Sequence, residues 1–120
     1  DWQGYQGQDF EAVVDLQEVK PINTLSATFL QDSRSWILMP AKVEYYVSND
    51  NVNFTLVGTV SNDIDPKETE NKIKNFSFQS TKEIKARYIK VIAKKFGVLP
   101  EWHQGFGGEA FIFIDEITIK

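Results

Sequence analysis

The 120-residue sequence contains no cysteine, one histidine, one methionine and no long hydrophobic run. The lack of cysteine excludes disulfide frameworks, thiolate zinc sites and cysteine nucleophiles. With only one histidine in addition, a zinc centre is not expected either. No apolar stretch approaches the roughly 18 residues of a transmembrane helix, so we expect no membrane span.

The charge is mildly acidic, with a formal net charge of −4 and an isoelectric point near 5.0. General nucleic-acid binders rely on basic residues that neutralise phosphates, so no nucleic-acid partner is expected. Eight of the thirteen basic residues nevertheless fall within residues 72–95, where Glu83 is the only acid. This segment is either a patch for phosphate or an anionic glycan, or the solvated faces of two strands. We favour the second interpretation, because lysines commonly protect sheet edges.

Apolar and polar residues alternate along most of the chain, and no helical period persists for more than two turns. In FEAVVDL, residues 10–16, the apolar side chains at every second position share one face. Further strands are expected at residues 23–29, 42–48, 54–60, 76–78, 87–93 and 109–120. Asn49–Asn51 predicts a turn, and the acidic stretch 61–72 predicts a solvated loop. The pattern predicts one all-β domain, a sandwich or a barrel, over residues 1–120.

Three longer connections, residues 1–8, 31–40 and 95–108, carry aromatic residues together with glycine, proline or polar residues. Loops at one end of a rigid sandwich commonly display binding residues. Catalysis is weakly supported there, because His103 would need a nearby acid and serine, and no nucleophile elbow is present. Asp115 and Glu116 are adjacent in one strand and cannot flank a glycosidic bond. We therefore expect no catalytic residues in this domain.

Recognition of a sugar fits the same loops better. A sugar ring offers an apolar C–H face and a rim of hydroxyls, so its site needs a flat aromatic ring and fixed polar groups. Trp102 can supply the ring, with Tyr5 or Trp36 closing one side. The candidates for holding the hydroxyls are Gln31, Asp32, Arg34 and His103.

Each of these residues also has a purely structural interpretation. Trp102 can plug the end of the sandwich, and Trp36, next to Ile37 and Leu38, can belong to the core. His103 can serve as a hydrogen-bonding group of its loop, and Arg34 can pair with Asp32. The binding hypothesis rests on the convergence of these residues on adjoining loops.

Several segments together resemble the discoidin, or coagulation-factor type C, domain over nearly the whole chain: FEAVVDL, ATFLQDSRSWILMPAKVEYYVSNDNVNF, ARYIKVIAKKFGVLPEWH and FIFIDEITI. The segment GVLPEWHQGFGGEAFIFIDEI is similar, more narrowly, to the version appended to bacterial exo-β-N-acetylhexosaminidases (chitobiases) and related glycosidases. By this resemblance, QDSRSW falls where carbohydrate-binding relatives place a cationic and a polar ligand residue. EWHQGF falls where they place the aromatic residue.

The resemblance implies a jelly-roll antiparallel β-sandwich of about eight strands, like galactose-binding domains, with ligands held by loops at one end. It also implies a structural calcium in many members, and Glu116 falls where relatives use a glutamate. Family members usually begin with an acidic, glycine-containing loop that supplies calcium ligands before the first tryptophan. Here the chain opens at Asp1–Trp2, so we expect a truncated first segment and an incomplete calcium site. No other cofactor is expected.

The function implied by the resemblance is a non-catalytic carbohydrate-binding module, cut from the C-terminal part of a larger bacterial glycoside hydrolase of β-N-acetylhexosaminidase type. The expected partners are a glycan of galactose or N-acetylhexosamine type and the parent catalytic domain, and the expected location is secreted, periplasmic or cell-surface. One alternative is a structural module that packs on the catalytic domain without a ligand. Another is adhesion to lipid or protein, for which Val98–Leu99 is the only suitable apolar pair.

Overall fold

The computed structural model describes residues 3–65, 67, 70–96 and 107–120. These residues form six antiparallel strands in one sheet with the order β1-β6-β2-β5-β3-β4. The strands are β1 (Gln3–Gln6), β2 (Phe10–Gln31), β3 (Lys42–Ser48), β4 (Thr55–Ser61), β5 (Lys72–Lys94) and β6 (Phe111–Ile119), and a short 3₁₀ turn, η1 (Ser33–Ser35), follows β2. The predicted all-β class is therefore confirmed. Within the described part of the chain, no helix is long and apolar enough to cross a membrane.

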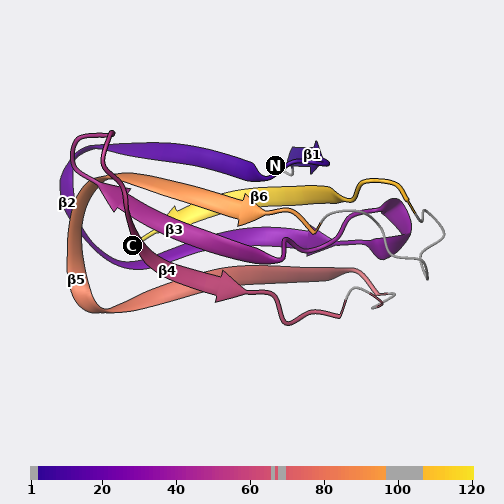
Figure 1. Ribbon diagram of the computed structural model, residues 1–120. Helices are drawn as coiled ribbons and strands as arrows, with labels where there is room; N and C mark the ends of the chain where they lie inside the picture. The colour runs from indigo at the N-terminus through magenta and orange to yellow at the C-terminus, as the bar shows by residue number, and fades with distance from the viewer. Residues whose placement is uncertain (1–2, 66, 68–69, 97–106) are drawn as a thin grey trace.

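The two longest strands, β2 and β5, pair with each other along both of their halves (Figure 1). Their register shifts between Asp15 and Lys20 and again between Ile22 and Thr24. Gln17, within the first irregularity, has a positive φ of 74°. Both strands bend in this region, so the sheet folds over on itself into two layers (Figure 1).

The alternation in the sequence predicted separate strands where the structure has these two long ones. The alternation of apolar and polar residues breaks at the bend, because side chains there no longer alternate between a buried and an exposed face. Counted by layer, four strand segments lie on each side. One layer holds β3, β4 and the paired segments 10–15 and 88–93, and the other holds β1, β6 and the paired segments 24–31 and 72–79. This arrangement agrees with the expected sandwich of about eight strands.

The core lies between the two layers and joins residues from both of them. The rings of Phe29 and Phe76 meet edge to face at 5.3 Å, and the hydroxyl of Tyr45 from the opposite layer donates a hydrogen bond to the Phe76 carbonyl. Burial raises the pKa of Tyr45 well above its usual range, so this hydroxyl remains a donor. Phe78 packs against Gly58, where an added β-carbon would lie 2.5 Å from the ring. The close contact between the layers at this point requires glycine.

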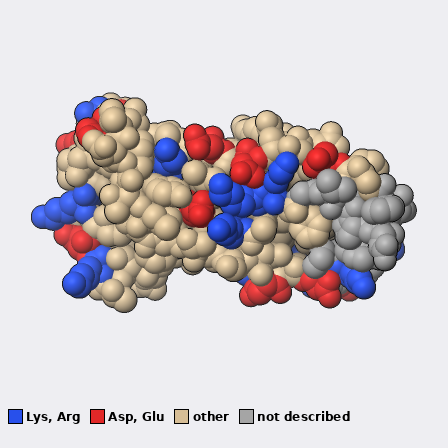
Figure 2. All heavy atoms as spheres, viewed as in Figure 1, with Lys and Arg blue, Asp and Glu red and all other residues tan. Residues whose placement is uncertain are grey.

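The basic residues of β5 lie on strand faces beside acids from other parts of the chain. Lys74 pairs with Asp63, Lys72 lies 3.8 Å from Glu70, and Lys94 lies 3.6 Å from Asp9. On the face shown in Figure 2, Lys and Arg are interspersed with Asp and Glu. This distribution favours the interpretation of residues 72–95 as solvated strand faces.

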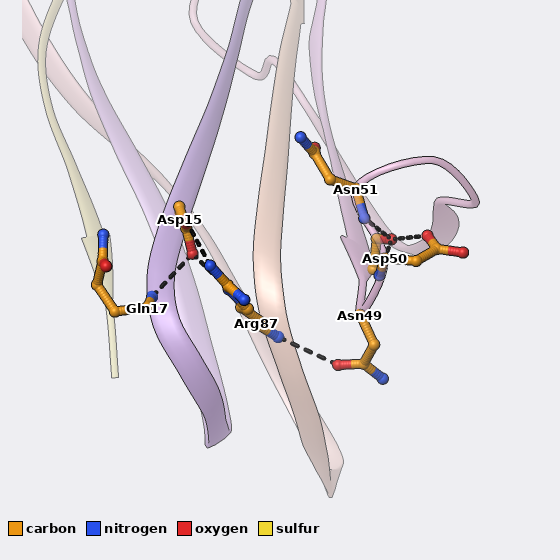
Figure 3. A network of polar contacts seen from close by, with 7 residues as sticks. Asp15, Gln17, Asn49, Asp50, Asn51 and Arg87 are labelled. Carbon is orange, nitrogen blue, oxygen red and sulfur yellow. Dashed lines mark hydrogen bonds and ion pairs between the residues drawn. The ribbon is translucent and has the colours of Figure 1, made fainter.

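A polar network ties the bend to the turn between β3 and β4 (Figure 3). The Arg87 guanidinium donates two hydrogen bonds to Asp15, at 2.9 and 3.1 Å, and the Arg87 backbone N–H donates to the side chain of Asn49 at 3.2 Å. The hydrogen bonds from Arg87 lower the pKa of Asp15. Asn51 adopts a positive φ of 60°, which confirms the predicted turn. The network therefore anchors the end of the sandwich opposite the loop that carries η1 (Figure 1).

Candidate functional site

The candidate site begins with the loop that joins β2 to β3. Asp32 and Ile37 exchange two backbone hydrogen bonds, at 2.8 and 3.0 Å, which close residues 32–37 into a compact loop around η1. The hydroxyl of Ser35 donates to the Asp32 carboxylate at 3.0 Å, and the Ser35 N–H donates to the Asp32 carbonyl at 3.0 Å. Asp32 thus organises the loop and keeps its half-buried carboxylate at the surface.

Arg34 occupies the middle of η1, and its side chain is exposed. The short turn around it is fixed by the backbone bonds of Asp32 and by the N–H of Trp36, which donates to the Ser33 carbonyl at 3.1 Å. A guanidinium displayed on such a loop can donate several hydrogen bonds in a fixed plane. This geometry suits a polar, hydroxyl-bearing ligand.

Trp36 ends the turn with an unusual backbone conformation. Its φ of 66° lies in the left-handed region, which is uncommon for a bulky residue and costs about 1–2 kcal/mol. Its half-buried side chain packs in a small cluster with Leu38, Ala110 and Phe96. The packing interpretation of Trp36 is therefore supported, and the residue stays partly exposed.

The loop is attached to the start of β6. The Phe111 N–H donates to the Trp36 carbonyl at 2.7 Å, and the Leu38 N–H donates to the Phe111 carbonyl at 3.1 Å. Phe96 contacts the same cluster from the end of β5. Residues on both sides of segment 97–106 are thus attached to the loop that displays Arg34. Trp102 and His103, the other two candidates for sugar contact, lie outside the described residues.

Tyr5 lies in β1, directly opposite Ile112 of β6. Its ring is 5.3 Å from that of Phe10 and packs against the main core, and its hydroxyl donates to Gln3 at 3.0 Å. Tyr5 and Trp36 therefore belong to different hydrophobic clusters.

Gln31, expected among the polar groups for sugar hydroxyls, is fully buried. Its amide donates to the Asp65 carbonyl at 2.9 Å, and its side-chain oxygen accepts a hydrogen bond from the Met39 N–H at 3.4 Å. The side chain satisfies backbone groups on two neighbouring segments and does not reach the surface. The expectation that Gln31 holds sugar hydroxyls was therefore wrong. The sequence does not reveal this, because a glutamine at the end of an alternating strand can be either exposed or buried.

Glu109 has a buried carboxylate oxygen that the sequence does not predict. One of its carboxylate oxygens, Oε2, is buried and has no hydrogen-bond partner among the described residues. The side chain packs against Gly7, where an added β-carbon would lie 3.2 Å from Cγ of Glu109, and the Glu109 carbonyl accepts a hydrogen bond from Gln6 at 3.1 Å. The glycines before Glu109 predict a turn, but nothing in the sequence predicts a buried carboxylate.

Glu116, the predicted calcium ligand, is exposed on β6. Two residues, Asp115 and Glu116, lie opposite the single residue Thr28 of β2, so they form a β-bulge and both point outward. In the described ranges, no three histidine or acidic side chains gather as a metal site. The side chains around Glu116 therefore do not make a calcium centre by themselves, and calcium binding stays a prediction.

The described residues offer no arrangement for hydrolysis. The Ser35 hydroxyl donates to Asp32, Ser33 is buried, and the adjacent acids Asp115 and Glu116 lie on one strand and flank no cleft. No pocket is formed within residues 3–65, 67, 70–96 and 107–120. What this part of the molecule presents is a fixed, shallow surface that carries Asp32, Arg34 and part of Trp36.

A two-layer antiparallel sandwich with its loops at one end is the architecture of the galactose-binding-like domains. Residues 1–110 match the family model described as the F5/8 type C domain. The chain therefore belongs to the F5/8 type C, or discoidin, domain family, as its segments indicated. Comparison with curated protein sequences gives no match.

Solved structures with the same fold include several carbohydrate-binding modules. A family 32 module from a family 31 glycoside hydrolase of Clostridium perfringens is 22% identical, with a TM-score of 0.54 over 92% of this chain and 75% of that one. Another from C. perfringens, in complex with galactose, is 21% identical, with a TM-score of 0.53 over 91% and 64%. The C-terminal domain of a chitobiase from Bacteroides fragilis is 17% identical, with a TM-score of 0.51 over 94% and 66%. At these identities the similarity establishes a shared fold.

Proposed function

We propose that this domain is a non-catalytic carbohydrate-binding module of a bacterial, exported glycoside hydrolase of β-N-acetylhexosaminidase type. Its role is to hold glycan near the parent enzyme, so that tethering raises the effective substrate concentration without any chemistry in the module. The observation that carries the proposal is the attachment of the Arg34 loop to residues on both sides of segment 97–106. That attachment favours a common site for Arg34 and Trp102.

The proposed site combines polar and apolar groups from adjoining loops. Arg34 and Asp32 hold sugar hydroxyls, Trp102 stacks on the C–H face of the ring, and His103 adds a further hydrogen bond. The exposed part of Trp36 forms one border, and Tyr5 supports the neighbouring strand. We propose galactose or an N-acetylhexosamine as the sugar, because the domains of similar fold include one in complex with galactose and one from a chitobiase. A single exposed sugar buries little surface, so a modest affinity is expected.

The test is a titration of the ¹⁵N-labelled domain with galactose, N-acetylgalactosamine and N-acetylglucosamine, with calcium and with a chelator. Chemical-shift changes are expected at residues 32–36 for at least one sugar. Trp102→Ala and Arg34→Ala should abolish them, while Lys85→Ala, which removes an exposed cation in the bend region of β5, should not. If no sugar binds and the domain instead associates tightly with the parent catalytic domain, the module is structural and the proposal is wrong.

A further inference from the structure

The outer surfaces of the two layers differ in where their charged side chains lie. The layer with β3 and β4 carries charged side chains outward, as in the ion pairs Lys42–Glu44, at 3.6 Å, and Arg87–Asp15, at 2.9 Å. On the opposite layer we define a neutral face, made of the outward residues at alternate positions of 24–30 and 73–79 together with Phe111 and Phe113. These positions contain no Lys, Arg, Asp or Glu. Asp115 and Glu116 of the β6 bulge point outward opposite Thr28, so two acids adjoin the neutral face on that strand.

An apolar row crosses the neutral face from edge to edge. Ile73 lies opposite Leu30, Leu30 lies opposite Phe113, and Phe113 lies opposite Gly4. Ile73 is 66% exposed, although it is a large apolar residue. The Phe113 ring lies over Gly4, where an added β-carbon would be 2.4 Å from the ring, and it meets Phe111 edge to face at 6.0 Å. The row thus spans four strands at the surface.

Hydroxyl and amide side chains occupy the rest of the neutral face. Thr28 lies opposite Asn75, and its hydroxyl donates to the Asn75 side chain at 3.3 Å. The next pairs along the two strands are Ser26, which is buried, with Ser77, and Thr24 with Gln79. Asn75, Ser77 and Gln79 are exposed. These groups donate and accept hydrogen bonds without carrying charge.

We propose that the neutral face is a second contact surface, for a chain of a neutral polysaccharide. Such a polymer presents C–H patches to an apolar row and hydroxyls to amide and hydroxyl side chains, and it has no charges to pair. An anionic glycan or a nucleic acid would need cations, which this face lacks. Serine is depleted at protein interfaces relative to other surface, so the exposed Ser77, between Asn75 and Gln79, favours a saccharide over a protein partner.

The neutral face is continuous with the candidate site at the loops. Phe111, whose ring meets that of Phe113 in the apolar row, forms backbone hydrogen bonds with Trp36 and Leu38. A polysaccharide that leaves the loop site in this direction meets the apolar row next. The contact surface nevertheless uses a different set of residues and does not require the loop site to bind a sugar.

The test is affinity electrophoresis of the domain in gels that contain a soluble neutral galactan, and depletion of the domain by insoluble chitin. The variant Ile73→Ser/Asn75→Ala changes only exposed side chains of the neutral face. We expect it to weaken polysaccharide binding about threefold or more, which is equivalent to about 0.65 kcal/mol or more. Titration with the monosaccharide should be unchanged in this variant. The matched control, Val13→Ser, alters a 44% exposed residue of the opposite layer and should have no effect.

Three results would overturn this inference. The wild-type domain could bind neither polysaccharide, or the double variant could bind both as tightly as the wild type does. Sedimentation could also show a wild-type dimer that becomes a monomer in the double variant, which would make the face an interface between two copies of this chain. If the proposed sugar site at the loops is wrong, the results differ from these three. In that case Arg34→Ala leaves the monosaccharide titration unchanged, while the double variant still weakens polysaccharide binding.

Discussion

The backbone N–H of Phe111 donates a hydrogen bond to the carbonyl of Trp36 at 2.7 Å, and Leu38 returns one to Phe111 at 3.1 Å. These two bonds fix the loop of residues 32–37 against the first residue of β6. The backbone position of Arg34 is therefore set by the sandwich itself, because Arg34 belongs to a loop that is closed by Asp32 and Ile37 and anchored on a central strand. A loop backbone that is held in place before the ligand arrives lowers the entropic cost of binding.

The left-handed backbone of Trp36 gives the first prediction. Trp36→Ala and Trp36→Gly both lose the packing against Leu38, Phe96 and Ala110. Alanine in addition keeps the strain of a positive φ, which glycine adopts freely. We expect both variants to be destabilised by about 1–3 kcal/mol, with Gly at least as stable as Ala. Urea unfolding measures which of the two variants is more stable. A Trp36→Ala variant clearly more stable than Trp36→Gly would contradict the assigned backbone conformation of Trp36.

Gln31 gives the second prediction, which separates a structural from a binding role. Gln31→Leu leaves the Asp65 carbonyl and the Met39 N–H without their partner. The free energy of unfolding should fall by about 1–3 kcal/mol, the cost of leaving buried polar groups unpaired. Sugar titration of the folded variant should be unaffected. Loss of sugar binding at full stability would show that Gln31 contacts the ligand.

The third prediction concerns the buried oxygen of Glu109. A carboxylate oxygen without a partner in a buried position costs folding free energy, so Glu109→Gln should raise the stability of the domain by up to about 1 kcal/mol. Glu18→Gln, at an exposed position, is the control and should leave stability unchanged. Thermal unfolding of the three proteins at neutral pH measures the difference. A destabilised Glu109→Gln would mean that the carboxylate has an essential partner.

Asp50 gives a prediction for the pH dependence of stability. Its carboxylate accepts hydrogen bonds from the N–H groups of Asn53 and Val52, and also from the side chains of Asn53 and Ser48, at 2.8 or 2.9 Å. These bonds, led by that from the Asn53 N–H, hold the pKa of Asp50 well below its usual range. Because the pKa is lower in the folded state, the stabilisation is complete above the unfolded value of about 3.9 and is lost as the pH falls below it.

The measurement is the free energy of unfolding from pH 6 to pH 2. The wild type should lose stability below about pH 4, and Asp50→Asn should lose less over the same range. Asp15, whose pKa is lowered by Arg87, contributes in the same direction, so Asp50→Asn flattens the profile only in part. Parallel profiles for the wild type and Asp50→Asn would contradict the role assigned to this carboxylate.

The sequence was sufficient for the fold class and for most strand positions, because period-two alternation is direct evidence of a half-buried sheet. It did not show that residues 10–31 and 72–94 are continuous strands, since alternation breaks where Gln17 and its neighbours turn the chain. It also did not predict β1, whose residues Gln3–Gln6 pair with β6 without any hydrophobic pattern of their own. Edge strands of this kind are specified by their partner rather than by local sequence.

The candidate site was predictable only in part. The loop 31–40 was identified from its composition, and the structure does place Arg34 at its exposed tip. Whether a polar residue of that loop faces solvent depends on tertiary contacts, which is why Gln31 was misplaced and the buried oxygen of Glu109 was not anticipated. The neutral face was equally hidden in the sequence, because it joins alternate residues from strands far apart in the chain.

Sugar binding at the Arg34 loop is tested by titrating the labelled domain with galactose and N-acetylhexosamines, with Trp102→Ala and Arg34→Ala measured in parallel. We expect that one of these sugars shifts the resonances of residues 32–36 and that each substitution removes the response while the domain stays folded. Binding that persists in both variants would contradict this expectation, as would a wild-type domain that responds to none of the sugars with or without calcium.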